Sequence, residues 1–231
     1  MKPKRKTSAQ EAVERMHDDA VVFIGGFGRG GVPENLIEAV CQKRLRGLTI
    51  VSNNAGTSST GIARLLEEGC VRKVVCSFPL AKESVVFKGL YNKGLVDLEV
   101  VPQGTMAERI RAGGAGLGGV LTPTGVGTDI AEGKQVIELD GRNYLLERAM
   151  RADFALVKAH KVDPMGNLVY RKAARNFNPI MAMAADWVMV EATTEVGVGD
   201  LDPEAIVTPG VYVDAYVAAI ASAGQSMETA A

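Results

Sequence analysis

The first hundred residues alternate short apolar runs with longer amphipathic segments, and this alternation constrains the fold more than any other feature. The apolar runs have the length of buried strands and cover Val21–Ile24, Leu48–Val51, Val71–Cys76 and residues 95–101. The segments between them predict helices that begin at Pro33 and that cover residues 59–68 and 81–92. Strands that alternate with helices in this way predict an α/β fold, with a mainly parallel sheet flanked by helices on both faces.

The two ends and the second half add smaller elements to this plan. Ser8 and Glu11 have capping-box spacing, which predicts one helix from the N-terminus to about residue 17. Asp140-Gly141 lies between two apolar runs and predicts a hairpin, the antiparallel addition to the sheet. Residues 155–160 and 187–191 predict further buried strands, and residues 214–221 a closing helix. We expect one domain over residues 1–231, with roughly the last ten residues frayed.

Composition and charge exclude several classes of protein. With 26 lysines and arginines against 27 acids, the chain has no basic stripe for nucleic acid. Its cysteines, Cys41, Cys70 and Cys76, have an odd count and no repeated spacing, so we expect neither disulfides nor a metal site. No apolar run reaches the roughly 18 residues of a membrane span, and the start lacks the apolar stretch of a secretory signal. We therefore expect a cytoplasmic protein with reduced thiols.

The strongest candidate site is a glycine-rich loop between the first long strand and the helix at Pro33. It contains five glycines in seven residues, and it runs Gly25, Gly26, Phe27, Gly28, Arg29, Gly30 and Gly31. Backbone N–H groups at such a loop, together with the helix N-terminus, can face an anion or an oxyanion. One glycine would indicate only a tight turn, whereas five favour a ligand site. A side chain at Gly26 should then block the ligand and spare the fold.

Two nucleotide-binding interpretations fit this loop less well. Gly26, Gly28 and Gly31 satisfy the G-x-G-x-x-G spacing, but the next strand ends in residues 52–54, Ser-Asn-Asn, where a dinucleotide fold needs an acid. A phosphate-binding P-loop would need a Lys-Ser or Lys-Thr pair after the glycines. A second glycine loop, residues 113–119, follows a helical run, so close approach to a ligand or partner chain explains it better. From its residues alone, the chain is an anion- or oxyanion-binding α/β domain.

Several segments resemble the α subunit of family I CoA-transferases, and they occur in the family's order. Residues 18–33 match its signature of an acid, three apolar residues, Gly-Gly-Phe and a later Gly-x-Pro, although Asp19 departs from the usual glycine or asparagine. Four further segments are similar to the family: residues 51–56, 102–105, 110–116 and 175–179. The resemblance extends over roughly residues 18–213.

The resemblance implies a reaction that this chain does not complete alone. The family moves CoA from an acyl-CoA to a carboxylate through a glutamyl-CoA thioester, and the glutamate lies in a Ser-Glu-Asn-Gly motif of the β subunit. This chain lacks that motif, and Glu34, although it precedes an asparagine, is better interpreted as a charge in a first helical turn. The resemblance therefore implies a β-subunit partner in an α2β2 assembly, coenzyme A as substrate without a permanent cofactor, and no catalytic residue in this chain.

By the same resemblance, residues 25–31 form the α-subunit side of the CoA and thioester pocket. Asn53 and Gln103 match polar residues that line the family's active site, although alone they could equally cap a turn or satisfy local backbone. Residues 116–128 look most like enzymes that act on acetate, butyrate or acetoacetate, so we expect transfer between a short-chain acyl-CoA and an acid such as acetate or acetoacetate. A 3-oxoadipate enzyme, which shares most other segments, is the alternative within the family. A non-catalytic sugar-phosphate or nucleotide-binding module is the alternative, but a sensor of that kind would carry a helix-turn-helix, which the residues before Ser8 do not provide.

Overall fold

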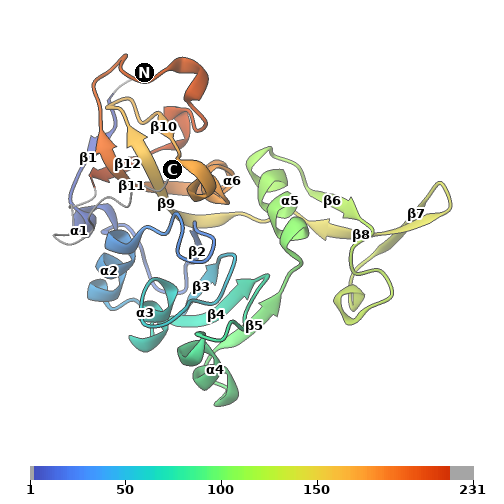
Figure 1. Cartoon of the computed structure of the whole chain (residues 1–231). Helices are drawn as coiled ribbons and strands as arrows, with labels where there is room; N and C mark the ends of the chain where they lie inside the picture. The colour runs from blue at the N-terminus through green and yellow to red at the C-terminus, as the bar shows by residue number, and fades with distance from the viewer. Residues whose placement is uncertain (1–2, 219–231) are drawn as a thin grey trace.

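The computed structural model describes residues 3–218, which form a nine-stranded sheet and a smaller three-stranded sheet (Figure 1). The larger sheet has the order β1-β12-β11-β9-β2-β3-β4-β5, and all these neighbours are parallel. Strand β10 pairs antiparallel with β9. The strands of this sheet are β1 (Arg5–Lys6), β2 (Val21–Ile24), β3 (Leu48–Val51), β4 (Val71–Cys76), β5 (Asp97–Val100), β9 (Ala152–Val162), β10 (Leu168–Val169), β11 (Ala185–Glu195) and β12 (Ala215–Ala218).

Helices cover both faces of this sheet, as the sequence predicts. One face packs against α1 (Ala9–Ala12), α2 (Glu34–Lys43), α3 (Ile62–Glu67) and α4 (Val85–Asn92), and the other packs against α5 (Gln103–Gly114) and α6 (Asn178–Met183). Strand β2 shows the alternation: Val22 and Ile24 join the first core, and Phe23 joins the second. None of the helices in residues 3–218 is long and apolar enough to cross a membrane.

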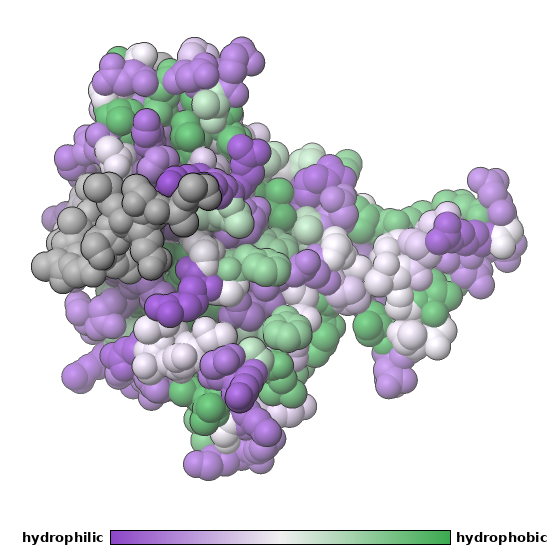
Figure 2. All heavy atoms as spheres, viewed as in Figure 1, coloured by the Kyte–Doolittle hydropathy of each residue, from purple (hydrophilic) through white to green (hydrophobic). Residues whose placement is uncertain are grey.

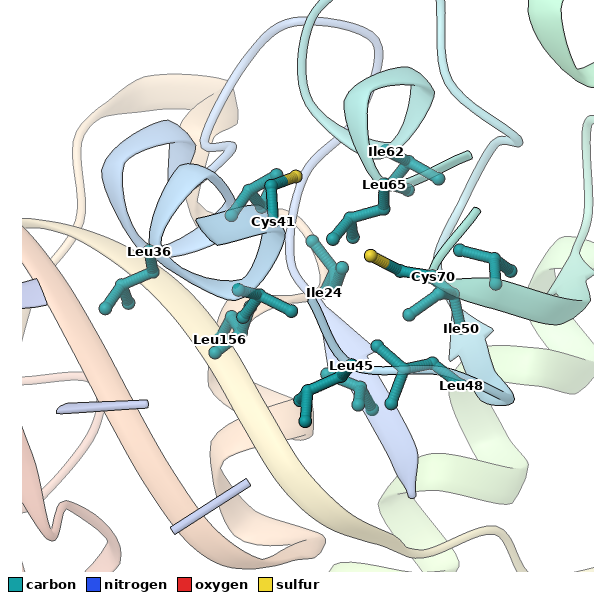
Figure 3. Packing of buried hydrophobic residues seen from close by; sticks show 14 of the residues in the cluster. Ile24, Leu36, Cys41, Leu45, Leu48, Ile50, Ile62, Leu65, Cys70 and Leu156 are labelled. Atoms are coloured by element: carbon teal, nitrogen blue, oxygen red, sulfur yellow. The ribbon is translucent and has the colours of Figure 1, made fainter. Parts of the chain in front are cut away.

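The core under α2 and α3 also contains two of the cysteines. Ile24, Leu36, Leu65, Cys41 and Cys70 converge between these helices and the sheet (Figure 3). Both cysteines are free thiols, as the sequence predicts, and burial raises the pKa of Cys41 to about 12. At neutral pH they are therefore protonated and pack as small apolar side chains.

The strand order reverses at β2, and this reversal fixes the place of the glycine loop. The chain builds β2, β3, β4 and β5 outward in one direction, then returns on the other side of β2 as β9 and continues to β11 and β12. The loops that follow β2 and β9 therefore leave the sheet in opposite directions. In open α/β sheets, such a switch point at the carboxyl ends of the strands is the usual place for a ligand.

The smaller sheet projects from the body as an arm beyond α5 (Figure 1). It consists of β6 (Gly119–Thr122), β7 (Val136–Leu139) and β8 (Arg142–Arg148) in the order β6-β8-β7, all antiparallel. The predicted hairpin is confirmed: Asp140 and Gly141 have φ values of 49° and 74°, as a tight two-residue hairpin turn requires. Strand β6 was not expected, because its sequence continues the second glycine loop.

Two expectations at the chain ends are wrong. The predicted N-terminal helix shrinks to α1, because Arg5–Lys6 pairs with β12 as strand β1, although the capping box of Ser8 and Glu11 does form. The predicted closing helix is strand β12 over Ala215–Ala218, because β1 and β11 flank it and place Tyr216 and Val217 in opposite cores. Residues 219–221 of that expectation, and the frayed tail, lie outside the described residues. Short 3-10 turns occur at Asp129–Ala131, Lys172–Arg175, Pro203–Ala205 and Gly210–Tyr212.

Helix α2 begins against a buried carboxylate that comes from β11. Glu191 is 2% exposed, and its Oε2 accepts the N–H groups of Asn35 at 2.8 Å and Leu36 at 3.2 Å. Its Oε1 lies 2.7 Å from Nζ of Lys158 on β9. Pro33, at the N-cap position, offers no side-chain acceptor. Glu191 therefore supplies the missing cap and joins α2 to the two central strands.

We predict that Glu191→Ala lowers the free energy of unfolding by about 3 kcal/mol, because it leaves Lys158 without its partner and two helix N–H groups without an acceptor. Urea denaturation measures the change. The double variant Lys158→Met/Glu191→Leu removes the stranded charge and should lose less stability than Glu191→Ala. Equal stability of Glu191→Ala and the wild type would contradict this account.

Candidate functional site

The sequence-predicted site residues meet at the carboxyl edge of the parallel sheet. The glycine loop, residues 25–31, follows β2, and Asn53 follows β3. Ser77 follows β4, and Gln103 follows β5 as the first residue of α5. Since neighbouring parallel strands end at the same edge, segments that lie far apart in the sequence form one surface.

The glycine loop has a two-residue tip at its middle, and the backbone of this tip is exposed. Phe27 and Gly30 exchange backbone hydrogen bonds of 2.9 and 3.0 Å, so Gly28 and Arg29 form the tip. Gly28 has φ +58°, a conformation that favours glycine. Among residues 3–218, no protein group accepts the N–H of Gly28 or Arg29. These two N–H groups remain available as donors.

The side chains of two asparagines bind the backbone of the glycine loop through hydrogen bonds. Oδ1 of Asn176 accepts the Gly26 N–H at 3.0 Å, and its Nδ2 donates to the Gly30 carbonyl at 3.0 Å. Asn178 is fully buried; its Nδ2 donates to the Gly31 carbonyl at 3.0 Å. Both asparagines lie in a segment that resembles the family, but the sequence alone assigned them no role. The Asn-x-Asn motif could have indicated this role, because the carbonyl groups of a glycine loop need hydrogen-bond donors.

The glycines of this loop differ in what a side chain at each position would contact. A Cβ on Gly25 would lie 1.8 Å from Oδ1 of Asn178, and one on Gly31 would lie 2.6 Å from the carbonyl of Ala174. Gly26 has φ +134°, and its Cβ would lie 2.6 Å from Cγ2 of Val32. The expectation that a side chain at Gly26 spares the fold is therefore wrong. A Cβ on Gly28 would meet nothing within 4 Å, but the φ of +58° there favours glycine. Gly30 is an open position without a positive φ, and its nearest neighbour, the Phe27 carbonyl, lies 3.5 Å from a built Cβ.

The helix N-terminus that the sequence offered as an anion site is already occupied. Glu191 fills it with an internal carboxylate. A second carboxylate, Glu34 in the first turn of α2, points across to the neighbouring loop and accepts the Gly61 N–H at 2.8 Å. Partial burial raises the pKa of this carboxyl above its usual range. Glu34 is therefore more than the first-turn charge that the sequence suggested.

Asn53 and Gln103 are brought into direct contact. Oδ1 of Asn53 accepts from Nε2 of Gln103 at 2.6 Å and from the Ser77 hydroxyl at 3.1 Å. Asn53 is buried, whereas Gln103 is exposed. This contact leaves the Asn53 amide group and one N–H of Gln103 as donors, an arrangement that can bind a carboxylate or an oxyanion.

A small hollow separates the glycine loop from the next loop along the edge. Its walls include Gly26 and Arg29 on one side, Thr57 and Thr60 on the other, and Glu34. The space amounts to about 20 Å³, which is enough for a water molecule. An acyl-CoA thioester is far larger, so this hollow alone cannot contain such a ligand.

Comparison with known proteins identifies the family. The family model for coenzyme A transferases matches residues 6–219. The A subunit of the 3-oxoadipate CoA-transferase of Pseudomonas putida is 52% identical over 223 residues, which cover 96% of each chain. The alpha subunit of the acetate CoA-transferase of Escherichia coli K12 is 46% identical over 214 residues, which cover 93% of this chain and 96% of that one.

A solved structure has the same fold. An acyl-CoA transferase from Escherichia coli O157:H7, crystallised as a thioester complex with CoA, superposes with a TM-score of 0.83 at 24% identity. The match covers 94% of this chain and 47% of the other, so this chain spans about half of that protein's length. Fold, family match and full-length relatives agree: the chain belongs to the coenzyme A transferase family, and it is a CoA-transferase subunit of the α type.

Proposed function

We propose that this chain works with a β subunit to move CoA from an acyl-CoA to a carboxylic acid, through a glutamyl-CoA thioester on the partner. The contact between Asn53 and Gln103 carries this proposal, because it gathers amide donors at the same carboxyl edge of the sheet as the glycine loop. Relatives that are themselves named as the A or alpha subunit of an enzyme support the partner. An α2β2 assembly is the closed, symmetric form that we expect.

The chemistry divides between the two chains. The partner's glutamate attacks the thioester carbonyl, and CoA leaves as a thiolate. The thiolate then attacks the glutamyl carbonyl of the resulting anhydride and releases the acyl carboxylate. Each step passes through a tetrahedral oxyanion, which preset N–H donors stabilise. In this chain, the amides of Asn53 and Gln103 and the tip N–H groups of Gly28 and Arg29 are such donors.

Exposed apolar side chains support the proposal that a partner chain covers this surface. Phe27, in the glycine loop, is 54% exposed, and Phe78, just after Ser77, is 56% exposed at the same edge. Apolar side chains also lie open along the arm (Figure 2), where Val136 is 50% and Leu139 is 45% exposed. A three-stranded sheet with exposed apolar residues gains stability when another surface covers it. The partner would also exclude water from the thioester.

We propose 3-oxoadipate as the preferred acid. Two relatives, each named as the A subunit of a 3-oxoadipate CoA-transferase, are 52% and 51% identical to this chain, compared with 46% for the chain from the acetate enzyme. Short-chain acids such as acetate and acetoacetate are the second candidates, on the resemblance of residues 116–128. Four of those residues, in β6 and the turn after it, line a cavity of about 310 Å³ with Pro102 and Gly104, which flank Gln103, so they support the short-chain acids as second candidates.

We predict that the purified chain transfers no CoA by itself and gains transfer when it is co-expressed with its β subunit. The test follows succinyl-CoA consumption with 3-oxoadipate, acetoacetate or acetate as acceptor, separating the CoA esters by chromatography, and follows assembly by sedimentation. Robust turnover by the isolated chain would overturn the division of roles. A higher kcat/KM for acetate than for 3-oxoadipate would overturn the choice of acid.

We predict that Gly30→Val lowers kcat/KM of the complex by about a hundredfold or more, because the side chain projects where the ligand meets the loop. The open surroundings of Gly30 should keep the free energy of unfolding within about 0.5 kcal/mol of wild type. Gly89→Val, at an open and exposed glycine within α4, is the matched control and should leave activity unchanged. Gly26→Val should instead lower the melting temperature. Wild-type activity of Gly30→Val would show that the loop is only scaffolding.

We predict that Gln103→Ala lowers kcat by about tenfold to a hundredfold, because one oxyanion or carboxylate donor is lost. Stability should change little, since Gln103 is exposed and makes one side-chain hydrogen bond. Asn53→Ala should lower both kcat and the melting temperature, because the buried Asn53 also accepts from Ser77. Equal kcat values for Gln103→Ala and wild type, at saturating substrates, would remove Gln103 from the site.

A further inference from the structure

The loop after β3 has the same form as the glycine loop after β2. Thr57 and Thr60 form an antiparallel bridge around a two-residue tip, just as Phe27 and Gly30 do. Since β2 and β3 are neighbours in the sheet, the two loops follow neighbouring strands, and Gly28 and Arg29 of the first loop line the small hollow together with Thr57 and Thr60 of the second. The second loop therefore forms a wall of the same site.

Glu34 is the side chain that connects these two loops. It lies three residues after Gly31, and its Oε2 accepts the N–H of Gly61 at 2.8 Å. Gly61 ends the second loop and begins α3; it is buried and has φ 57° with ψ −130°, and no side chain caps α3 from that position. Glu34 accepts the backbone N–H of this N-cap residue, the contact that a glutamate at position N3 makes in a capping box.

The carboxylate of Glu34 is not required at its own helix terminus. The N–H groups of Asn35 and Leu36 already bind Glu191. The charged groups that face Glu34 are Glu191, which raises its pKa, and Arg29 and Lys158, which lower it. Its one short contact is the bond to Gly61, so its local role is to fix the second loop.

We propose that Glu34 is a positioning residue of the CoA-transfer reaction, which holds the loop of residues 57–61 against the glycine loop. This inference rests on the proposed function. When the bond is lost, the Gly61 N–H has no acceptor and the two walls of the site separate. A hydrogen-bond acceptor is sufficient for this role, since a neutral amide oxygen accepts the same N–H as a carboxylate does.

The test compares Glu34→Ala with Glu34→Gln in the complex with the β subunit. Glu34→Ala should lower kcat/KM for the acyl-CoA by at least about tenfold, because small displacements of site walls have large effects on rate. Glu34→Gln should restore kcat/KM to within about threefold of wild type. Glu38→Ala is the matched control: Glu38 also joins α2 to α3, through Arg64 at 3.6 Å, but at the exposed surface, and its loss should leave transfer unchanged.

Amide hydrogen exchange provides a readout that does not depend on turnover. Exchange of residues 57–63 should become faster in Glu34→Ala and remain near wild type in Glu34→Gln and Glu38→Ala. Unchanged exchange and unchanged kcat/KM in Glu34→Ala would overturn the proposal, and so would a Glu34→Gln enzyme as impaired as Glu34→Ala. If the wild-type complex shows no CoA transfer while the exchange pattern is as expected, the proposed function fails and the positioning of the loop stands.

Discussion

The interaction on which this structure most depends is the buried carboxylate of Glu191 at the N-terminus of α2. It binds two N–H groups of that helix and the ammonium group of Lys158, so one side chain joins α2, β9 and β11. This contact lies near the point where the strand order reverses, between the half of the sheet that β2 begins and the half that β9 begins. Because the glycine loop ends where α2 starts, fixing this helix start fixes the loop.

The same principle extends along the whole edge: side chains from distant elements hold the backbone of each loop. Asn176 and Asn178 hold the glycine loop, Glu34 holds the second loop, and the Ser84 hydroxyl donates to the Gly56 carbonyl at 2.8 Å. These contacts fix the backbone of both loops at the strand ends. The donors at the glycine tip and on Asn53 and Gln103 therefore lie on a fixed backbone, and in the proposed reaction this is the condition for electrostatic stabilisation of a transition state.

Local patterns in the sequence predicted the parts of this fold that local chemistry determines. Alternating strands and helices, the Asp140-Gly141 turn and the capping box of Ser8 all form. The spacing of apolar residues predicted a helix over residues 214–221, but the neighbouring strands β1 and β11 impose a strand on residues 215–218. Sheet geometry also explains why Asn53 and Gln103, each placed after a strand, meet although 50 positions separate them.

The parts that sequence could not supply are contacts between distant residues. Nothing near Glu191 in the sequence indicates that it caps a helix 156 positions earlier. Likewise, the spacing of the loop glycines does not distinguish Gly26, which must lack a side chain to pack against Val32, from Gly30, which faces open space. Family resemblance could name the loop as a site, but only the packing around each glycine separates the positions that build the loop from those that can meet a ligand.

An open candidate site of this kind is consistent with the proposal that the chain forms half of a reaction centre. A thioester must be shielded from water during transfer, and the hollow between the two loops holds about 20 Å³. This chain spans 47% of the acyl-CoA transferase that was crystallised as a CoA thioester complex, so a protein with this fold and a bound thioester has as much chain again. The rigid edge can then present fixed donors to a covalent intermediate that another surface carries. In the proposed complex, the donors of this chain stay in one position while the partner supplies the reacting carboxylate. The donors then need not reorient in each half-reaction.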